Sequence, residues 1–177
     1  MSRIELVNAS CADLEVDAVV NAANKYLRAG GGICGVIFQA AGPLELVTAC
    51  RKHSTPLNDG DAVMTPSFNM TNCKAIIHAV GPDFRHTPDA FDALCDAYYN
   101  SLVVLKDNGY HSIAFPLISA GIFSGDLDEP AAESARQCLR AYDRFNADFP
   151  DADVDVRLCA FTSREMAEAL RIINYVK

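Results

Sequence analysis

The chain has 177 residues, of which 50% are hydrophobic, so it can build one sizeable core, and we expect a single domain over residues 1–177. Its formal net charge of -8 argues against a groove that follows nucleic-acid phosphates, because such grooves depend on clustered lysine and arginine. No apolar run approaches the roughly 20 residues that cross a bilayer, and the first residues lack the order of a signal peptide, which together predict a cytoplasmic protein without a membrane partner.

Short runs rich in valine and isoleucine alternate along the chain with patterns of helical spacing. This alternation is typical of helices that flank a largely parallel sheet. Several of the runs are apolar at nearly every position, which indicates strands buried on both faces. The strands are predicted at residues 3–7, 18–21, 62–65, 75–80, 112–116 and 154–161.

The first two predicted helices differ in their signals. The apolar residues between Ile33 and Ala41 recur at helical spacing, which predicts a helix there. Thr87-Pro88 is expected to cap and start a second helix, because threonine suits the cap and proline the first turn. Asn108-Gly109 would end that helix with a left-handed residue.

Two further helices are predicted in the last third of the chain. Pro130, preceded by two acidic residues that the helix dipole favours, is expected to open a helix through about Phe145. The sequence Thr162-Ser163-Arg164-Glu165 has the pattern of a capping box, and it would start a last helix over residues 164–176.

The seven cysteines form no Cys-x-x-Cys pair, and an odd number does not suit a disulfide framework. We therefore expect reduced thiols packed in the core. Cys50 and His53 could supply two metal ligands on one helical face, but no second pair follows at zinc-like spacing, so no metal is expected. His78 lies among strand residues and is expected to be a structural histidine.

The first candidate site is the segment that joins the strand at 18–21 to the helix after Ile33. Gly30, Gly31 and Gly32 leave backbone N–H groups bare at a helix start, which suits a phosphate. The glycines up to Gly35 also match the dinucleotide fingerprint formally. These glycines lie too far from the preceding strand, and the acidic residue that the fingerprint requires at the end of the next strand is missing. An NAD-dependent oxidoreductase is therefore only a distant alternative.

The second candidate site is the loop at 116–125, which directly follows a predicted strand. Its small residues allow successive N–H groups to converge on an anion, while Phe123 could cover a sugar or ring face. The same loop could equally be a tight turn with an anchoring phenylalanine.

Five motifs occur in order along the chain: Val-Asp-Ala-Val-Val-Asn-Ala-Ala-Asn at 16–24, Ala-Gly-Gly-Gly-Ile at 29–33, Ala-Ala-Gly-Pro at 40–43, His-Ala-Val-Gly-Pro at 78–82 and Pro-Leu-Ile-Ser-Ala-Gly-Ile-Phe at 116–123. On these motifs nearly the whole chain resembles a macrodomain, the α/β module that recognises ADP-ribose. The resemblance implies a three-layer α/β/α fold with a mixed, mostly parallel central sheet. It also implies an ADP-ribose cleft at the strand ends and no cofactor.

The resemblance carries a set of ligand-binding residues onto this chain. In that reading Asn24 would bond the distal ribose, near Phe123, and two backbone loops would enclose the diphosphate. Phe161 would lie against adenine, although packing in the core is an equal alternative. The expected ligand-binding residues are Ser10, Cys11, Ala22, Asn24, Gly31, Gly32, Ile33, Ser119, Ala120, Gly121, Ile122, Phe123 and Phe161.

The chain departs from the family pattern at two positions. Ser10 stands where many relatives carry the aspartate that accepts the adenine amino group, so we expect weaker or less adenine-selective binding. Cys34 stands where hydrolytic relatives often carry an aspartate that helps to activate water. A thiol with a lowered pKa at a helix start could act as base or nucleophile, but a packing thiol is favoured.

The resemblance thus implies binding of ADP-ribose, or of a protein that carries it, more firmly than catalysis. Hydrolysis of ADP-ribosyl-protein or of O-acetyl-ADP-ribose stays open, with Asn24 and Cys34 as candidate catalytic residues. The alternative is a reader module that binds the modification without removing it. The oligomeric state is not indicated by any sequence feature.

Overall fold

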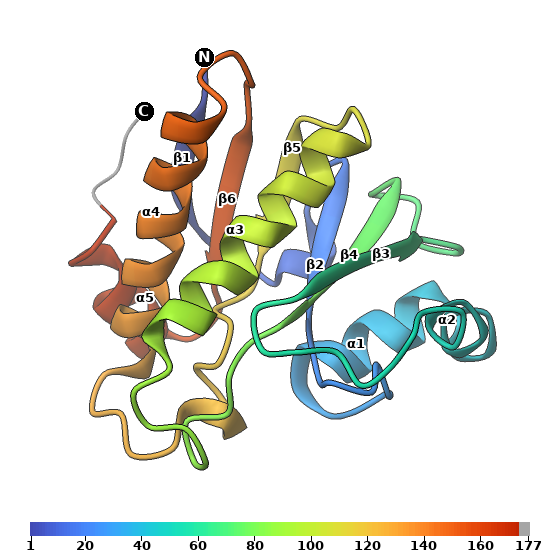
Figure 1. Ribbon diagram of the computed structural model, residues 1–177, viewed down its shortest axis with the longest axis horizontal. Helices are drawn as coiled ribbons and strands as arrows, with labels where there is room; N and C mark the ends of the chain where they lie inside the picture. Colours follow the sequence, from blue (N-terminus) through green and yellow to red (C-terminus); the bar gives the residue numbers. More distant parts are fainter. Residues whose placement is uncertain (174–177) are drawn as a thin grey trace.

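The computed structural model describes residues 1–173. One six-stranded sheet crosses the molecule in the order β1-β6-β5-β2-β4-β3, with helices packed along it (Figure 1). The strands are β1 (Arg3–Asn8), β2 (Ala18–Ala23), β3 (Ala62–Pro66), β4 (Ala75–Val80), β5 (Ser112–Phe115) and β6 (Asp155–Ala160). The helices are η1 (Cys11–Asp13), α1 (Gly32–Ala41), α2 (Pro43–Cys50), α3 (Phe91–Asp107), η2 (Ile122–Ser124), α4 (Pro130–Asp148) and α5 (Ser163–Leu170).

The sheet is mixed and mostly parallel, as expected. The pairs β1–β6, β6–β5, β5–β2 and β2–β4 are parallel, and β3 alone runs antiparallel, beside β4 at the edge. All six predicted strands are present, with ends shifted by a few residues. β4 is buried at every position, which confirms burial on both of its faces.

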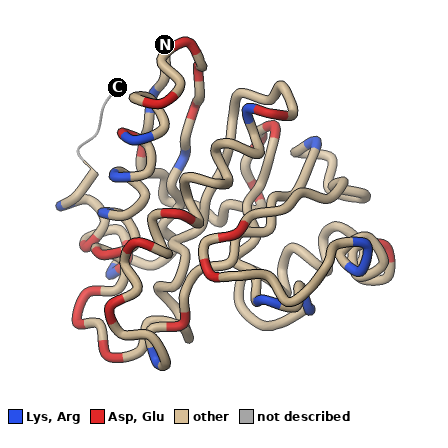
Figure 2. Tube along the Cα trace, in the orientation of Figure 1, with Lys and Arg blue, Asp and Glu red and all other residues tan. Residues whose placement is uncertain are grey.

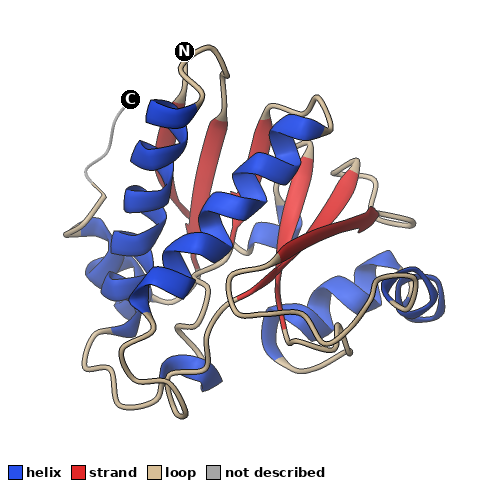
Figure 3. Ribbon diagram, in the orientation of Figure 1, coloured by secondary structure: helices blue, strands red, loops and turns tan. Residues whose placement is uncertain are grey.

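Neighbouring residues of each strand point into two different hydrophobic clusters, one on each face of the sheet. Val20 and Ile77 pack with α3, α4 and α5. Val19 and Ile76 pack on the opposite face with α1, α2 and η1. Figure 3 shows α3 and α4 crossing the first of these faces. The result is the expected three-layer α/β/α arrangement.

The start predicted at Thr87-Pro88 for the helix that corresponds to α3 is wrong. α3 begins at Phe91, after the N-cap residue Ala90, rather than at Thr87. The Thr87 hydroxyl donates to the carbonyl oxygen of Asp83 at 3.0 Å, so it closes a turn before the helix instead of capping it. The predicted stop is confirmed, because α3 ends at Asp107 and Gly109 has a φ of +73°.

The capping box before α5 is confirmed. Thr162 Oγ1 accepts from the N–H of Glu165 at 3.1 Å, and the Glu165 carboxylate accepts from the N–H of Thr162 at 2.8 Å. α5 begins at Ser163 and ends at Leu170, so the prediction that this helix continues to about residue 176 is wrong over residues 171–173, and its remaining residues lie outside the described part of the chain. α4 begins at Pro130 as predicted and continues past Phe145 to Asp148.

The helix α2 was not predicted. The signal for α2 is Gly42 followed by Pro43 at the start of the helix. Gly42 has a φ of +110°, a backbone conformation that residues with a side chain rarely adopt. These two residues end α1 and start α2 at once. Within the described residues, no single helix is long and apolar enough to cross a membrane, and only the pair α1 and α2, bent by 108°, passes that test together.

The seven cysteines all lie within the described residues, and each is free and buried. This confirms the expectation of packed thiols. Six of them lie on strands and helices, and Cys73 lies in the loop between β3 and β4.

Candidate functional site

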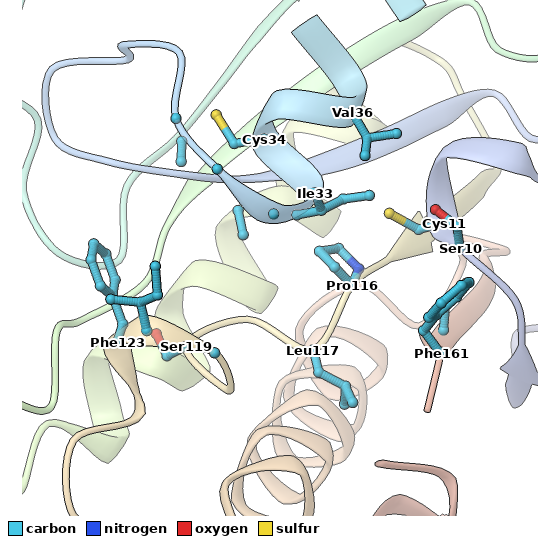
Figure 4. Close-up of a pocket in the computed structure, with 18 of the residues that line it drawn as sticks. Ser10, Cys11, Ile33, Cys34, Val36, Pro116, Leu117, Ser119, Phe123 and Phe161 are labelled. Carbon is cyan, nitrogen blue, oxygen red and sulfur yellow. The ribbon is translucent and has the colours of Figure 1, made fainter. Parts of the chain in front are cut away.

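A cleft of about 770 Å³ lies beyond the carboxyl ends of β1, β2, β5 and β6, between the loops that follow these strands (Figure 4). Parallel strands bring the ends of distant segments together at this edge, which is where open α/β sheets bind ligands. Its lining residues are Ala9, Ser10, Cys11, Asp13, Ala22, Ala23, Asn24, Gly30, Gly31, Gly32, Ile33, Cys34, Val36, Pro116, Leu117, Ser119, Gly121, Ile122, Phe123, Cys159, Phe161 and Glu165. Of the expected binding residues, only Ala120 is absent from this lining within the described part of the chain.

The glycine loop forms one wall of the cleft. Gly31 is the N-cap residue of α1, and Gly32 has a φ of +58°, a conformation that other residues rarely adopt. No described side chain caps α1, so its first N–H groups remain open toward the cleft. A Cβ atom on Gly35 would lie 2.7 Å from the carbonyl oxygen of Gly30, which explains the need for glycine in the first turn.

The loop after β5 forms the facing wall. Ser119 has a φ of 60°, and its buried hydroxyl donates to the carbonyl oxygen of Pro82 at 2.7 Å. A Cβ atom on Gly81 would collide with this same hydroxyl. The loop is thus held by the segment after β4. Within the described residues, the N–H groups of Gly121, Ile122 and Phe123 have no backbone partner, so they are available to an anion.

The two ends of the cleft carry different side chains. Figure 4 shows Phe161 beside Ser10 and Cys11 at one end. Phe123 lies with Ser119 at the other end. The side chain of Phe161 does not pack in the core, because the residue is 72% exposed, so the core alternative is wrong.

The backbone at Phe161 is held from both sides. Its N–H donates to the Glu165 carboxylate at 3.1 Å, and its carbonyl oxygen accepts from Asn8 Nδ2 at 3.1 Å. An exposed aromatic ring on a fixed backbone suits stacking with a flat ligand group.

The charge of the cleft is unusual for an anion site. Among the described lining residues the charged ones are Asp13 and Glu165, and both are acidic. A phosphate there would therefore be held by backbone N–H groups and the positive end of α1. The sequence did not indicate Asp13 as a site residue, although it follows Ser10 by a single helical turn.

Asn24 has a structural role in addition to its place on the cleft. Its Oδ1 accepts from the N–H groups of Tyr26 and Arg28, each at 3.1 Å, and its Nδ2 donates to the carbonyl oxygen of Arg28 at 2.9 Å. The side chain thus builds the first half of the glycine loop. One Nδ2 hydrogen remains for a ligand.

Cys34 is buried in the first turn of α1, and its thiol donates to the carbonyl oxygen of Arg28 at 3.7 Å. Burial raises the pKa of the Cys34 thiol, while hydrogen bonds to the Gly30 backbone and to Asn21 lower it by less. The lowered pKa required for a thiolate base or nucleophile is therefore not found. The geometry favours the packing role.

His78 is fully buried, and its ring contacts Asn21 Nδ2 at 3.0 Å and Thr65 Oγ1 at 2.9 Å. Burial lowers the pKa of His78 to about 3, with a smaller effect from the charge of His53. A neutral ring that accepts at Nδ1 and donates at Nε2 satisfies both partners. This confirms a structural histidine.

The pair Cys50 and His53 does not form a metal site. The His53 ring bonds the carbonyl oxygen of Met64 at 3.0 Å, and Cys50 faces His78 instead. Over residues 1–173, no group of three histidine, cysteine or acidic side chains is placed to hold a metal ion.

Comparisons with known proteins agree with this architecture. A family model described as Macro domain matches residues 20–135. An uncharacterized protein of Fusobacterium nucleatum is 42% identical over 136 residues, which are 76% of this chain and 76% of that protein. An O-acetyl-ADP-ribose deacetylase of Escherichia fergusonii is 45% identical over 126 residues, which are 69% of this chain and 70% of that protein.

Solved structures show the same similarity. An Oceanobacillus iheyensis macrodomain with ADP superposes with a TM-score of 0.85 at 30% identity, covering 96% of this chain and 89% of that chain. A Trypanosoma brucei macrodomain in complex with ADP-ribose superposes with a TM-score of 0.80 at 28% identity, covering 95% of this chain and 68% of that chain.

Proposed function

The chain belongs to the macrodomain family, and from this premise we propose that it binds ADP-ribose, free or as a mono-ADP-ribosyl group on a protein, in the cleft at the strand ends. The observation that carries the proposal is the pair of backbone walls: the N–H groups at the start of α1 face those of Gly121 to Phe123 across one cleft. Two such walls suit a diphosphate, because fixed N–H donors replace its hydration without a cationic side chain.

The ends of the cleft set the direction of the ligand. Adenine would lie at the end of Phe161 and Ser10, where an exposed ring and a free hydroxyl are available. The distal ribose would lie between Phe123 and the remaining Nδ2 hydrogen of Asn24.

We further propose that the cleft hydrolyses an ester at the distal ribose, as the name of the Escherichia fergusonii relative indicates for that protein. The oxygen of a water molecule positioned by the bound phosphate would bond to C1″ or to the acyl carbon. After attack at C1″, the bond between C1″ and the ester oxygen breaks, a carboxylate leaves and the incoming oxygen keeps one water proton. After attack at the acyl carbon, the bond between that carbon and the ribose oxygen breaks, and the ribose oxygen takes one water proton. In either case the products are a ribose hydroxyl and a carboxylate, and the second water proton passes to solvent. Because Cys34 supplies no carboxylate, the rate would come from positioning and from preorganised N–H groups.

A reader module without turnover is the alternative, and Cys34 is the residue that favours it. The buried thiol with its raised pKa offers no base beside the ribose. This alternative keeps all the binding contacts and removes only the chemical step.

Titration calorimetry with ADP-ribose and NAD, run beside release of label from a mono-ADP-ribosylated protein, tests the proposal. We expect tighter binding of ADP-ribose than of NAD, together with loss of label. Binding of ADP-ribose with undiminished label would support the reader alternative. Tighter binding of NAD than of ADP-ribose would support the oxidoreductase alternative.

Cys34→Ala is expected to keep the rate of label release within a few-fold of wild type, since a packing thiol contributes no chemistry. A large loss of this rate at unchanged affinity for ADP-ribose would show that the thiol takes part in the chemical step.

We also propose a cytoplasmic location, because seven free thiols suit a reducing compartment. We propose in addition that residues 1–177 act as one domain, since a single sheet carries both hydrophobic clusters.

A further inference from the structure

Two buried hydroxyl groups, one from each of the helices α3 and α4, contact the loop that follows β5. Tyr98 lies on α3 and Ser134 on α4, and both side chains are buried. The ring of Tyr98 packs edge-on against Phe115, the last residue of β5, with the ring centroids 5.0 Å apart. The Tyr98 hydroxyl is therefore held at the point where the loop begins.

The two hydroxyls form a closed ring of hydrogen bonds with one loop residue, Ile118. The N–H of Ile118 donates to the Tyr98 hydroxyl oxygen at 3.0 Å, and the Ser134 hydroxyl donates to the carbonyl oxygen of Ile118 at 2.6 Å. The two hydroxyl oxygens lie 2.6 Å apart. Because Ser134 gives its one hydrogen to Ile118, the Tyr98 hydroxyl donates to Ser134 Oγ. Burial raises the pKa of Tyr98 well above its usual value, so this hydroxyl keeps its proton.

Ile118 itself does not line the cleft. Its side chain is buried in the hydrophobic cluster that includes α3 and α4, whereas Leu117 and Ser119 on either side of it belong to the lining. The bonds to the N–H and the carbonyl oxygen of Ile118 fix the peptide groups before and after this residue. Ser119 follows with a φ of 60°, and from there the chain turns to the open N–H groups of Gly121 to Phe123.

The loop contains no charged group that could hold it in another way. Residues 116–125 include no lysine, arginine, aspartate or glutamate, and this segment is tan throughout in Figure 2. Among the described residues, Tyr98 and Ser134 supply the side chains that bond the backbone of this segment. The position of the loop therefore depends on neutral hydrogen bonds and on packing.

We propose that Tyr98 and Ser134 are positioning residues of the diphosphate site, which hold the loop so that the N–H groups of Gly121 to Phe123 face the cleft before a ligand binds. The inference rests on the proposed function, which assigns these N–H groups to the diphosphate. A loop that is already ordered loses less conformational entropy on binding, so the ligand binds more tightly. Neither hydroxyl touches the ligand, because neither residue belongs to the lining of the cleft.

Tyr98→Phe tests the proposal, because it removes the hydroxyl and keeps the ring. The N–H of Ile118 then loses its partner, and we expect the Kd of ADP-ribose, measured by calorimetry, to rise about fivefold to twentyfold. NMR relaxation should show lower backbone order parameters at Gly121 to Phe123, with those of the glycine loop unchanged. A tyrosine that only stabilises the fold would lower the melting temperature and leave the Kd and these order parameters at their wild-type values.

Tyr99→Phe is the matched control. Tyr99 is the next residue of α3, and its hydroxyl donates to the Asp148 carboxylate at 2.6 Å, away from the cleft. This variant loses one hydroxyl from the same helix, and it should keep the wild-type Kd and the wild-type order parameters.

Ser134→Ala removes the second hydroxyl of the ring, so the test does not depend on the folding of one variant. It should also raise the Kd of ADP-ribose and lower the order parameters of Gly121 to Phe123. Its control is Ser101→Ala, because Ser101 is a buried serine on α3 whose hydroxyl donates to Ala97 in its own helix at 2.7 Å. Ser101→Ala should change neither quantity.

Wild-type Kd and wild-type loop order in both Tyr98→Phe and Ser134→Ala would overturn the inference while the proposed function stands. Equal losses of affinity in Tyr98→Phe and Tyr99→Phe would also overturn it, because the effect would then come from the packing of α3. Failure of the wild-type protein to bind ADP-ribose would overturn the proposed function, and the inference with it.

Discussion

Ser10 and Asp13 both line the cleft, and we propose that both contact the adenine of the ligand. The Ser10 hydroxyl caps no described helix, so it is free to meet a ligand. Asp13 is exposed and lines the cleft. Its carboxylate can therefore accept from an adenine amino group, in a geometry that the sequence pattern around Ser10 did not indicate.

Asp13→Asn should abolish the modest preference that we expect for ADP-ribose over its inosine analogue. A hydrogen bond to a charged acceptor contributes about 1.5–3 kcal/mol, and exposure reduces that gain here. Calorimetry with both ligands measures the preference. Glu15→Gln is the control, because Glu15 is an exposed acid outside the lining. If Asp13→Asn keeps the preference and Ser10→Ala removes it, Ser10 alone reads the base.

At the scale of elements, the two binding loops depend on glycines whose contacts the sequence did not reveal. Predicted strands and helix ends were mostly confirmed, because caps and apolar periodicity act over a few residues. The start of α3 was missed since the hydroxyl of Thr87 bonds Asp83, a contact outside the helix pattern. The close approach of Gly35 to Gly30 is likewise a feature of the folded loop.

Gly35→Ala is expected to weaken ADP-ribose binding by about tenfold, or roughly 1.4 kcal/mol. The new Cβ would lie 2.7 Å from the Gly30 carbonyl oxygen, so the glycine loop must shift. Gly109→Ala is the control. An alanine at this position would be strained by the φ of +73° and would lower stability, but the position lies away from the cleft. Calorimetry and thermal unfolding separate the two effects. Wild-type affinity in Gly35→Ala would show that the loop tolerates the shift.

At the scale of the whole molecule, one buried histidine links stability to pH. The pKa of His78 is about 3 in the folded chain and about 6.5 when exposed. Between these values the unfolded chain binds a proton that the folded chain does not. Stability contributed at this site is therefore complete above pH 6.5 and falls as the pH is lowered toward 3.

Denaturant unfolding between pH 6.5 and 4.5 should show the free energy of unfolding decreasing by up to about 1.4 kcal/mol per pH unit. His78→Gln should flatten this slope, because glutamine can accept from Asn21 and donate to Thr65 without titrating. His86→Gln, at an exposed histidine, should leave the slope in place. An equal slope in His78→Gln and wild type would assign the acid sensitivity to other groups.

The sequence by itself determined the order of the six strands and of the helices α1, α3, α4 and α5, the free thiols and the motifs of the two loops, because each depends on residues close together in the chain. Only the tertiary structure decided that Gly31 and Ile122 line one cleft, that the ring of Phe161 is exposed, and that burial raises the pKa of Cys34. These properties arise where the strand order β6-β5-β2 brings distant segments together, and burial and backbone approach at that edge exist only in the folded chain.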